Sequence, residues 1–144
     1  MKHLPTVATT MTPFPHVIDV NASLQQASHM MVEHGFHHLP VTDDGAVVGL
    51  LSEEDIRRIK APVTGISDIS ELQVKDICCM QILVVDIHDR LDLVLALMAE
   101  RHLQAAIVMR NDKLAGILTT SDALRKFAEL LESLRPTNGG GDAA

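Results

Sequence analysis

Apolar positions along this chain follow two periods in a regular order: every second residue over short stretches, and every third or fourth residue over longer ones. The first period is typical of half-buried strands and the second of amphipathic helices. The expected strands are 16–20, 39–42 and 46–51 in the first half, and 82–87, 105–109 and 113–118 in the second. Helices are expected after the first and third strands of each half, so the order β-α-β-β-α occurs twice.

Local signals mark the ends of these elements. Ser23 and Gln26 form a capping-box pattern at the start of one helix, and Gly35 stands where its C-cap is expected. The corresponding helix of the second half is expected from Asp89. Each strand pair is joined by a short polar turn that favours a hairpin; the two turns are Asp43-Asp44-Gly45 and Arg110-Asn111-Asp112.

The two halves are copies of one another. A shift of 67 residues aligns Val7–Ile59 with Val74–Lys126 without a gap, and eleven of the 53 aligned positions are identical. The sequence therefore predicts a first repeat over 1–60, a surface linker over 61–73, a second repeat over 74–134 and a disordered tail over 135–144. Two such repeats bury their sheets by packing together, which gives an α/β fold with pseudo-two-fold symmetry and a cleft between the halves.

One turn is repeated where the last strand of each half meets the last helix. Its copies are Ser52-x-x-Asp55 and Thr119-x-x-Asp122. Both fit a helix N-cap with an acidic residue three positions on. They equally fit a ligand site in which the aspartate accepts hydrogen bonds from sugar hydroxyls and the helix N–H groups face a phosphate.

Two features bear on the choice between these interpretations. Gly49 and Gly116 lie inside strands just before the turns, where glycine often marks the close approach of a ligand or another backbone. Glu53 and Glu54 add negative charge to the first helix N-terminus and disfavour a phosphate there. The second turn has Thr120-Ser121 instead, so it is the preferred site.

The duplication, the Gly-Phe-His-His-Leu-Pro-Val segment at 35–41 and the two Gly-x-x-[Ser/Thr]-x-x-Asp turns resemble a tandem pair of CBS (cystathionine β-synthase) domains, a Bateman module. The resemblance covers about residues 7–131. It implies a regulatory module, not an enzyme, that binds AMP, ADP, ATP, S-adenosylmethionine or NAD and signals to a partner. It also implies a homodimer.

The resemblance implies ligand-binding residues in both halves. In it the turn aspartate holds the ribose, the turn hydroxyl lies near phosphate, and strand backbone flanks the adenine. The implied positions in the second half are Thr119, Asp122, Gly116, Val84, Ala105 and Ala106. Those in the first half are Ser52, Asp55, Gly49, Val17, His37, His38, Leu39 and Pro40.

The sequence departs from the family at two of these positions. Many relatives have a ligand-contacting threonine where Val17 and Val84 stand, and valine cannot donate a hydrogen bond. The alternative is therefore a degenerate pair that acts in protein–protein assembly without a small ligand. The expected apolar stripe of the last helix, Leu124, Phe127, Leu130/Leu131 and Leu134, either packs on its own module or forms a dimer seam.

Composition limits the remaining function classes. The net charge is −7 with three Phe and no Trp or Tyr, which argues against nucleic acid. There is no run long enough for a membrane span, and the two cysteines, Cys78 and Cys79, are adjacent, so a cytoplasmic domain is expected. We expect the cysteines to pack in the core.

Other chemistry has little support in the sequence. Four histidines, His29, His34, His37 and His38, could form a metal sensor, but His29 and His34 are five apart and point about 140° from each other on a helix. No nucleophile–base arrangement is recognisable, so neither a catalytic site nor a bound metal or cofactor is expected.

Overall fold

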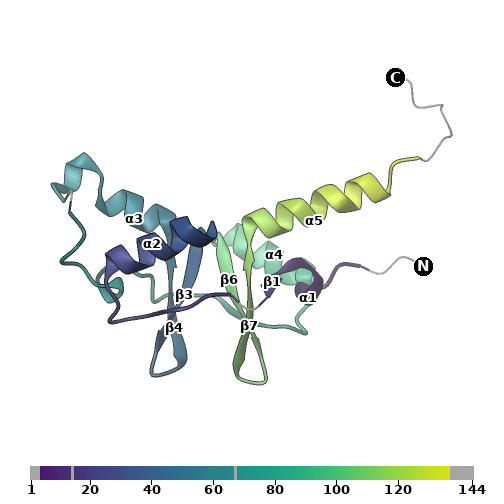
Figure 1. Cartoon of the computed structure of the whole chain (residues 1–144). Helices are drawn as coiled ribbons and strands as arrows, with labels where there is room; N and C mark the ends of the chain where they lie inside the picture. Colours follow the sequence, from purple (N-terminus) through teal and green to yellow (C-terminus); the bar gives the residue numbers. More distant parts are fainter. Residues whose placement is uncertain (1–3, 14, 67, 137–144) are drawn as a thin grey trace.

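The two halves of the chain form two sheets, each with its own helices, on opposite sides of the molecule (Figure 1). This computed structural model describes residues 4–13, 15–66 and 68–136. The first half contains β2 (Ile18–Asp19), α2 (Leu24–His34), β3 (His38–Asp43), β4 (Ala46–Ser52) and α3 (Glu53–Ile59). The second contains β5 (Val84–Asp86), α4 (Leu91–Glu100), β6 (Ala105–Arg110), β7 (Lys113–Thr119) and α5 (Thr120–Ser133). The predicted α/β fold of two β-α-β-β-α repeats is confirmed.

A short segment precedes each set of β-α-β-β-α elements. The first comprises α1 (Val7–Thr10) and β1 (Thr12–Pro13), and the second lies between the halves and comprises the 3-10 helices η1 (Pro62–Thr64) and η2 (Val74–Asp76). The first strand of each half is shorter than predicted, at two residues instead of five in β2 and three instead of six in β5. Of the predicted tail at 135–144, residues 137–144 lie outside the described residues.

The helix signals are largely confirmed. The Ser23 hydroxyl accepts a hydrogen bond from the Gln26 N–H at 3.0 Å, and Gly35 ends α2 in the left-handed conformation with φ 70°. The helix α4 begins at Leu91, two residues later than predicted. The reason is that the Asp89 carboxylate accepts from the Asp86 N–H at 2.9 Å and so holds a turn before the helix.

The two sheets repeat one register. The strand β3 pairs parallel with β2 and antiparallel with β4, and β6 pairs in the same way with β5 and β7. A bulge falls between Val41 and Thr42 in one sheet and between Val108 and Met109 in the other, 67 residues apart. The hairpin turns therefore point the same way in both halves (Figure 1).

The segments that lead into the two repeats are exchanged between them. The strand β1 pairs with β7 of the second half, with Thr12 opposite Ile117. Cys79, which is 67 residues after Thr12, makes the matching bridge to Leu50 of the first half. The cores follow the same rule, because Val7 is buried in the second-half core and Val74 in the first. We call residues 6–13 and 73–80 the first and second arms.

The predicted surface linker is only partly at the surface. Ile69 is buried in the first core, and Leu72 packs against the same core. The Leu24 N–H also donates to the Leu72 carbonyl at 2.8 Å. The apolar residues of this segment therefore fold back onto the first half, which the Pro and Gly signals alone did not predict.

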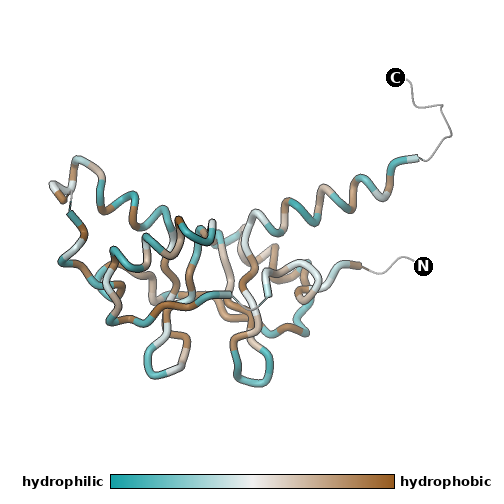
Figure 2. The backbone as a smooth tube through the Cα atoms, in the orientation of Figure 1, coloured by the Kyte–Doolittle hydropathy of each residue, from teal (hydrophilic) through white to brown (hydrophobic). Residues whose placement is uncertain are grey.

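Apolar residues follow the central strands, whereas the hairpin turns are hydrophilic (Figure 2). The largest fully buried side chains lie mostly on these strands and include Leu39, Leu51, Ile107 and Leu118. Burial of such aliphatic side chains stabilises the fold by about 1.5–3 kcal/mol each. Within the described ranges, no helix is both long and apolar enough to span a bilayer.

Candidate functional site

A cavity of about 490 Å³ lies between the two halves. Both repeated turns reach it, since Ser52 and Thr119 are among the lining residues. From the first half it is also lined by the segment from Gly35 to His38, and from the second by Asp122 and the residues before it. The structure thus brings together five of the predicted site residues, namely Ser52, Thr119, Asp122, His37 and His38.

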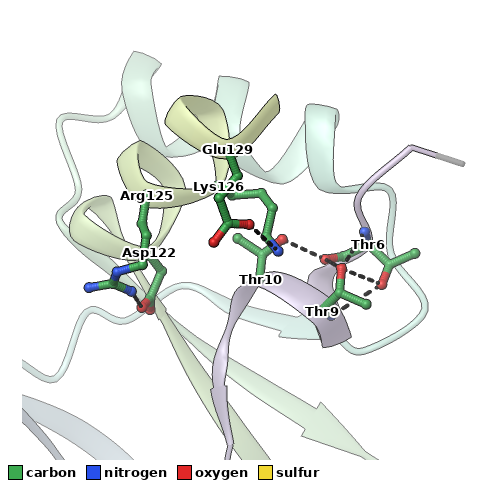
Figure 3. A network of polar contacts seen from close by, with 7 residues as sticks. All are labelled: Thr6, Thr9, Thr10, Asp122, Arg125, Lys126 and Glu129. Atoms are coloured by element: carbon green, nitrogen blue, oxygen red, sulfur yellow. Dashed lines mark hydrogen bonds and ion pairs between the residues drawn. The ribbon is translucent and has the colours of Figure 1, made fainter. Parts of the chain in front are cut away.

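Asp122 is the buried acid of this cavity, with 5% of its surface exposed. Its carboxylate accepts from the Thr119 N–H at 3.0 Å and from the Thr12 hydroxyl at 3.2 Å. Arg125, one turn along α5, donates to the same carboxylate at 3.2 Å (Figure 3). The Thr119 hydroxyl in turn accepts from the Asp122 N–H, which completes a capping box. The turn is therefore an N-cap whose aspartate also faces a cavity.

Asp55, the repeat-related aspartate, has a different surrounding. Its carboxylate accepts from the Ser52 N–H at 3.0 Å and lies 3.5 Å from an Arg58 guanidinium nitrogen. Its side chain is 22% exposed, against 6% for Asp122. Asp55 does not line the cavity described above. The first arm supplies a hydroxyl to Asp122, whereas the second arm has Cys79 at the equivalent position.

Eleven of the sixteen lining residues were not among the sequence candidates, and two of these, Thr12 and Ile117, lie where the first arm meets β7. Thr12 comes from the first arm, and Ile117 is its neighbour on β7. Their place in the site depends on the exchange of the arms. The repeat alignment pairs Thr12 with Cys79 but does not show that each arm joins the opposite sheet.

The two strand glycines have a structural cause. A Cβ on Gly116 would lie 2.7 Å from the Thr12 carbonyl oxygen, and a Cβ on Gly49 would lie 2.8 Å from the Cys79 carbonyl oxygen. Real Cβ atoms do not come so close to backbone oxygens. The close approach predicted at both positions is thus made by the exchanged arm.

The remaining sequence candidates lie away from the lining of this cavity. Four of them, Leu39, Pro40, Ala105 and Ala106, are buried strand residues. Val17 and Val84 are 40% and 51% exposed, Val17 just before β2 and Val84 within β5. Their roles toward a ligand stay predictions.

His37 is held by charged neighbours at the edge of the cavity. Its Nδ1 is in short contact with the Glu53 carboxylate, and Arg57 binds the other oxygen of that carboxylate at 2.8 Å. The hydrogen bond from His37 is the main cause that lowers the pKa of Glu53. Glu53 therefore remains ionised, and its two carboxylate oxygens are occupied by His37 and Arg57.

His38 lies among acids from both halves. Burial lowers its pKa, with a further contribution from the charge of His37, while Asp55, Asp122 and Glu54 act in the opposite direction. Burial prevails, so His38 is more easily deprotonated in the folded chain than in the unfolded one.

We expect His38 to make the protein less stable as the pH falls. A lowered folded-state pKa means that the unfolded chain binds more protons below about pH 6.5, so protonation favours unfolding. The midpoint of thermal unfolding should fall between pH 7 and pH 5.5, and His38→Gln should reduce this slope. His29→Gln, at an exposed position on α2, is the control that keeps it. Equal slopes in all three proteins would contradict the assignment.

The structure gives less support to chemistry at the two cysteines and at the histidine cluster. Cys78 packs against the first core, as predicted, and burial raises the pKa of its thiol, whereas Cys79 is exposed, contrary to the prediction. His34 stacks on His16 at 4.6 Å between ring centroids. Across the residues that the structure describes, no group of three or more His, Cys, Asp or Glu side chains could hold a metal ion.

Sequence comparison gives the family. A family model described as CBS domain matches residues 7–61 and again residues 74–129. The chain therefore belongs to the CBS domain family and contains a tandem pair of its domains. Pairs of this kind are typically regulatory instead of catalytic.

Solved structures have the same fold. A CBS domain protein called CBSX2, in complex with AMP, is 28% identical with a TM-score of 0.68 over 88% of this chain and 98% of that one. The CBS domain pair of protein MJ0100, in complex with 5′-methylthioadenosine and S-adenosyl-L-methionine, is 21% identical with a TM-score of 0.77 over 89% and 99%.

Curated relatives are longer proteins. Homoserine O-acetyltransferase of Methanocorpusculum labreanum is 30% identical over 118 residues, which are 80% of this chain and 23% of that protein. The uncharacterized protein MJ1225 of Methanocaldococcus jannaschii is 25% identical over 73% of this chain and 41% of its own length. The chain thus spans less than half of each of these two relatives.

Proposed function

We propose that this chain is a cytoplasmic regulatory module that binds an adenosine-containing ligand in the cavity between its repeats and signals occupancy to a partner protein. The observation that carries the proposal is the buried Asp122 carboxylate at the edge of that cavity. A carboxylate suits two neighbouring ribose hydroxyls, since it only accepts and can accept from both. The AMP complex of CBSX2 supports the class of ligand.

The ribose would take the place of one existing partner of Asp122. Thr12 and Arg125, which line the cavity, donate to the carboxylate, while the Thr119 N–H belongs to the helix cap. A carboxylate has about four acceptor positions, so two sugar hydroxyls replace Thr12 while the Arg125 pair and the cap stay intact. Ile117, Thr119 and His37 line the same cavity. In this proposal the base lies against Ile117, and the 5′ end of the ligand lies toward Thr119 and His37.

The replacement of the Thr12 hydroxyl by the ribose offers a route by which ligand binding is signalled to a partner protein. Thr12 belongs to the first arm, which pairs with β7 and places Val7 in the second core. Loss of the Thr12 hydrogen bond on binding would loosen the arm at one end. Regulation requires that the ligand binds two arrangements of the protein with different affinities and that the partner distinguishes them, and the arm is an element that can supply two arrangements.

Thermal unfolding tests the proposal simply. A ligand at 100 times its Kd stabilises the folded state by about 2.7 kcal/mol, which raises the Tm of a chain of this size by about 5–10 °C. We expect such a shift with at least one of adenosine, 5′-methylthioadenosine, AMP, ADP, ATP, S-adenosylmethionine and NAD. The chain has no Trp or Tyr, so bound nucleotide also shows at 260 nm. No shift with any compound and no absorbance at 260 nm would contradict the proposal.

The outer face of α5 supports a homodimer. Leu124, Phe127, Leu131 and Leu134 are 70%, 58%, 51% and 62% exposed, so this stripe does not pack on its own module. Leu130 is half-buried. The helix also extends beyond the body of the protein (Figure 1). The spacing of three, four and three residues is that of a coiled-coil seam, which a second copy of α5 would fit.

We expect Phe127→Glu to convert a dimer into a monomer. A charge in the middle of an apolar seam is costly to bury, so the dimer dissociation constant should rise by about 100-fold or more. Sedimentation velocity at several concentrations measures this. The matched control is Val32→Glu on α2, which changes an isolated residue with 82% exposure. A wild-type protein that is a monomer at all concentrations would contradict the homodimer. If it also bound no ligand, the remaining function would be assembly with other proteins.

A further inference from the structure

The charges that line the cavity are predominantly negative. Three carboxylates, those of Glu53, Glu54 and Asp122, face two guanidinium groups, those of Arg57 and Arg125. Both arginines are already paired: Arg57 binds Glu53 at 2.8 Å and Arg125 binds Asp122 at 3.2 Å. The acidic and basic side chains that line the cavity leave a net charge of −1 before the histidines are counted; Arg58, which pairs with Glu54 at 3.3 Å, is not part of the lining. A phosphate that entered would have to compete with a carboxylate for each arginine.

The start of α5 is also largely occupied. The Thr120 N–H donates to the Gln104 carbonyl at 3.0 Å, and the Asp122 N–H donates to the Thr119 hydroxyl at 3.2 Å. Anion binding at a helix N-terminus depends on several free N–H groups that point at the ligand together. Here two of the first three are used within the protein. Among the described residues, Ser121 has the one N–H group of these three without such a use, and a single N–H group is too little to bind a chain of phosphates.

We infer that the cavity selects adenosine compounds whose 5′ substituent is neutral or positively charged, and that it discriminates against ADP and ATP. This inference rests on the proposed function, which it narrows by ligand charge. A nucleoside, a thioether or a sulfonium uses the Asp122 carboxylate and the apolar wall without adding negative charge. Each additional phosphate brings negative charge close to Glu53 and Glu54, on the opposite side of the same cavity.

The size of the effect follows from distance and screening. Charges separated by several ångströms in a partly hydrated cavity interact with an effective dielectric constant between those of protein and water. We expect the affinity to fall roughly three- to fivefold for each added negative charge at physiological salt. The order of Kd should therefore be adenosine or 5′-methylthioadenosine, then AMP, then ADP, then ATP.

Isothermal titration calorimetry on the full chain tests this order. The series adenosine, AMP, ADP and ATP is titrated in magnesium-free buffer, because Mg²⁺ would neutralise the phosphates, and S-adenosylmethionine serves as the cationic probe. The variant Glu53→Gln with Glu54→Gln should reduce the ratio of the Kd for ATP to that for adenosine by about tenfold. Glu129→Gln with Glu132→Gln removes the same charge from α5 residues that do not line the cavity, and should leave the ratio unchanged.

The possible results distinguish a failure of the inference on ligand charge from a failure of the proposed function. The inference is supported if the Kd values follow the predicted order and the ratio of the Kd for ATP to that for adenosine falls in the Glu53 and Glu54 variant but not in the control. An affinity for ATP equal to or higher than that for adenosine in the wild-type chain overturns the inference and leaves the proposed function standing. No binding of any compound in the series and of S-adenosylmethionine overturns the proposed function and the inference with it.

Discussion

Asp122→Asn should lower the affinity for an adenosine ligand by about 100-fold or more. The wild-type carboxylate would accept from two ribose hydroxyls, and hydrogen bonds to a charged group contribute about 1.5–3 kcal/mol each. Asparagine keeps the size and one acceptor for the Thr119 N–H, so the helix cap persists, but its NH₂ group cannot accept. Titration calorimetry on variants whose folding is checked by circular dichroism measures the loss.

The control for this variant is the repeat-related change Asp55→Asn. Asp55 has the same capping role but does not line the cavity, so the affinity should change less than about threefold. Equal losses in the two variants would mean that both turns bind ligand. A loss in Asp55→Asn alone would move the site to the first half and contradict the preference for the second turn.

Gly116→Ala should destabilise the protein by about 1–3 kcal/mol, which is a large effect for a single methyl group. The new Cβ would lie 2.7 Å from the Thr12 carbonyl oxygen and 2.6 Å from the Met11 sulfur, so the first arm must move away from β7. Thr12 would then lose its position over Asp122. We expect a lower Tm together with faster hydrogen exchange of the amides in 7–12.

Gly45→Ala separates the steric clash from the loss of a glycine as such. Gly45 has φ 84° but no atom within 4 Å of an added Cβ, so alanine there costs only backbone strain of about 1–2 kcal/mol in the hairpin. Its Tm should also fall, while exchange in the first arm stays at the wild-type rate. Unchanged arm exchange in Gly116→Ala would show that the arm does not depend on the close approach.

The repeat made most of the fold predictable from sequence. A gapless shift of 67 residues fixes two equivalent sets of elements, and local chemistry sets their ends: Ser23 and Gly35 bound one helix, and Ser52 and Thr119 cap two others. The same shift relates both sheet bulges and both arm bridges. These features depend on local propensities and on residue types that the two halves share.

What sequence could not predict depends on long-range packing. The period of apolar residues does not reveal that Val7 enters the second core and Val74 the first, because both cores are aliphatic and either would accept a valine. For this reason Thr12 was missed, and the glycines at 49 and 116 had two open explanations. The duplication predicts a cleft between the halves but not which residues of the two turns line it, because that follows from the packing of the halves.

The central claim is that an adenosine ligand binds between the repeats at Asp122. A titration of ¹⁵N-labelled protein with adenosine or AMP, followed by backbone amide NMR, tests it directly. We expect saturable shifts of the Thr119, Thr120, Ser121 and Asp122 amides, with shifts of Thr12 that follow the same binding curve. Saturation with shifts confined to other parts of the chain, such as the Asp55 turn or the outer face of α5, or no shifts at millimolar ligand, would contradict it.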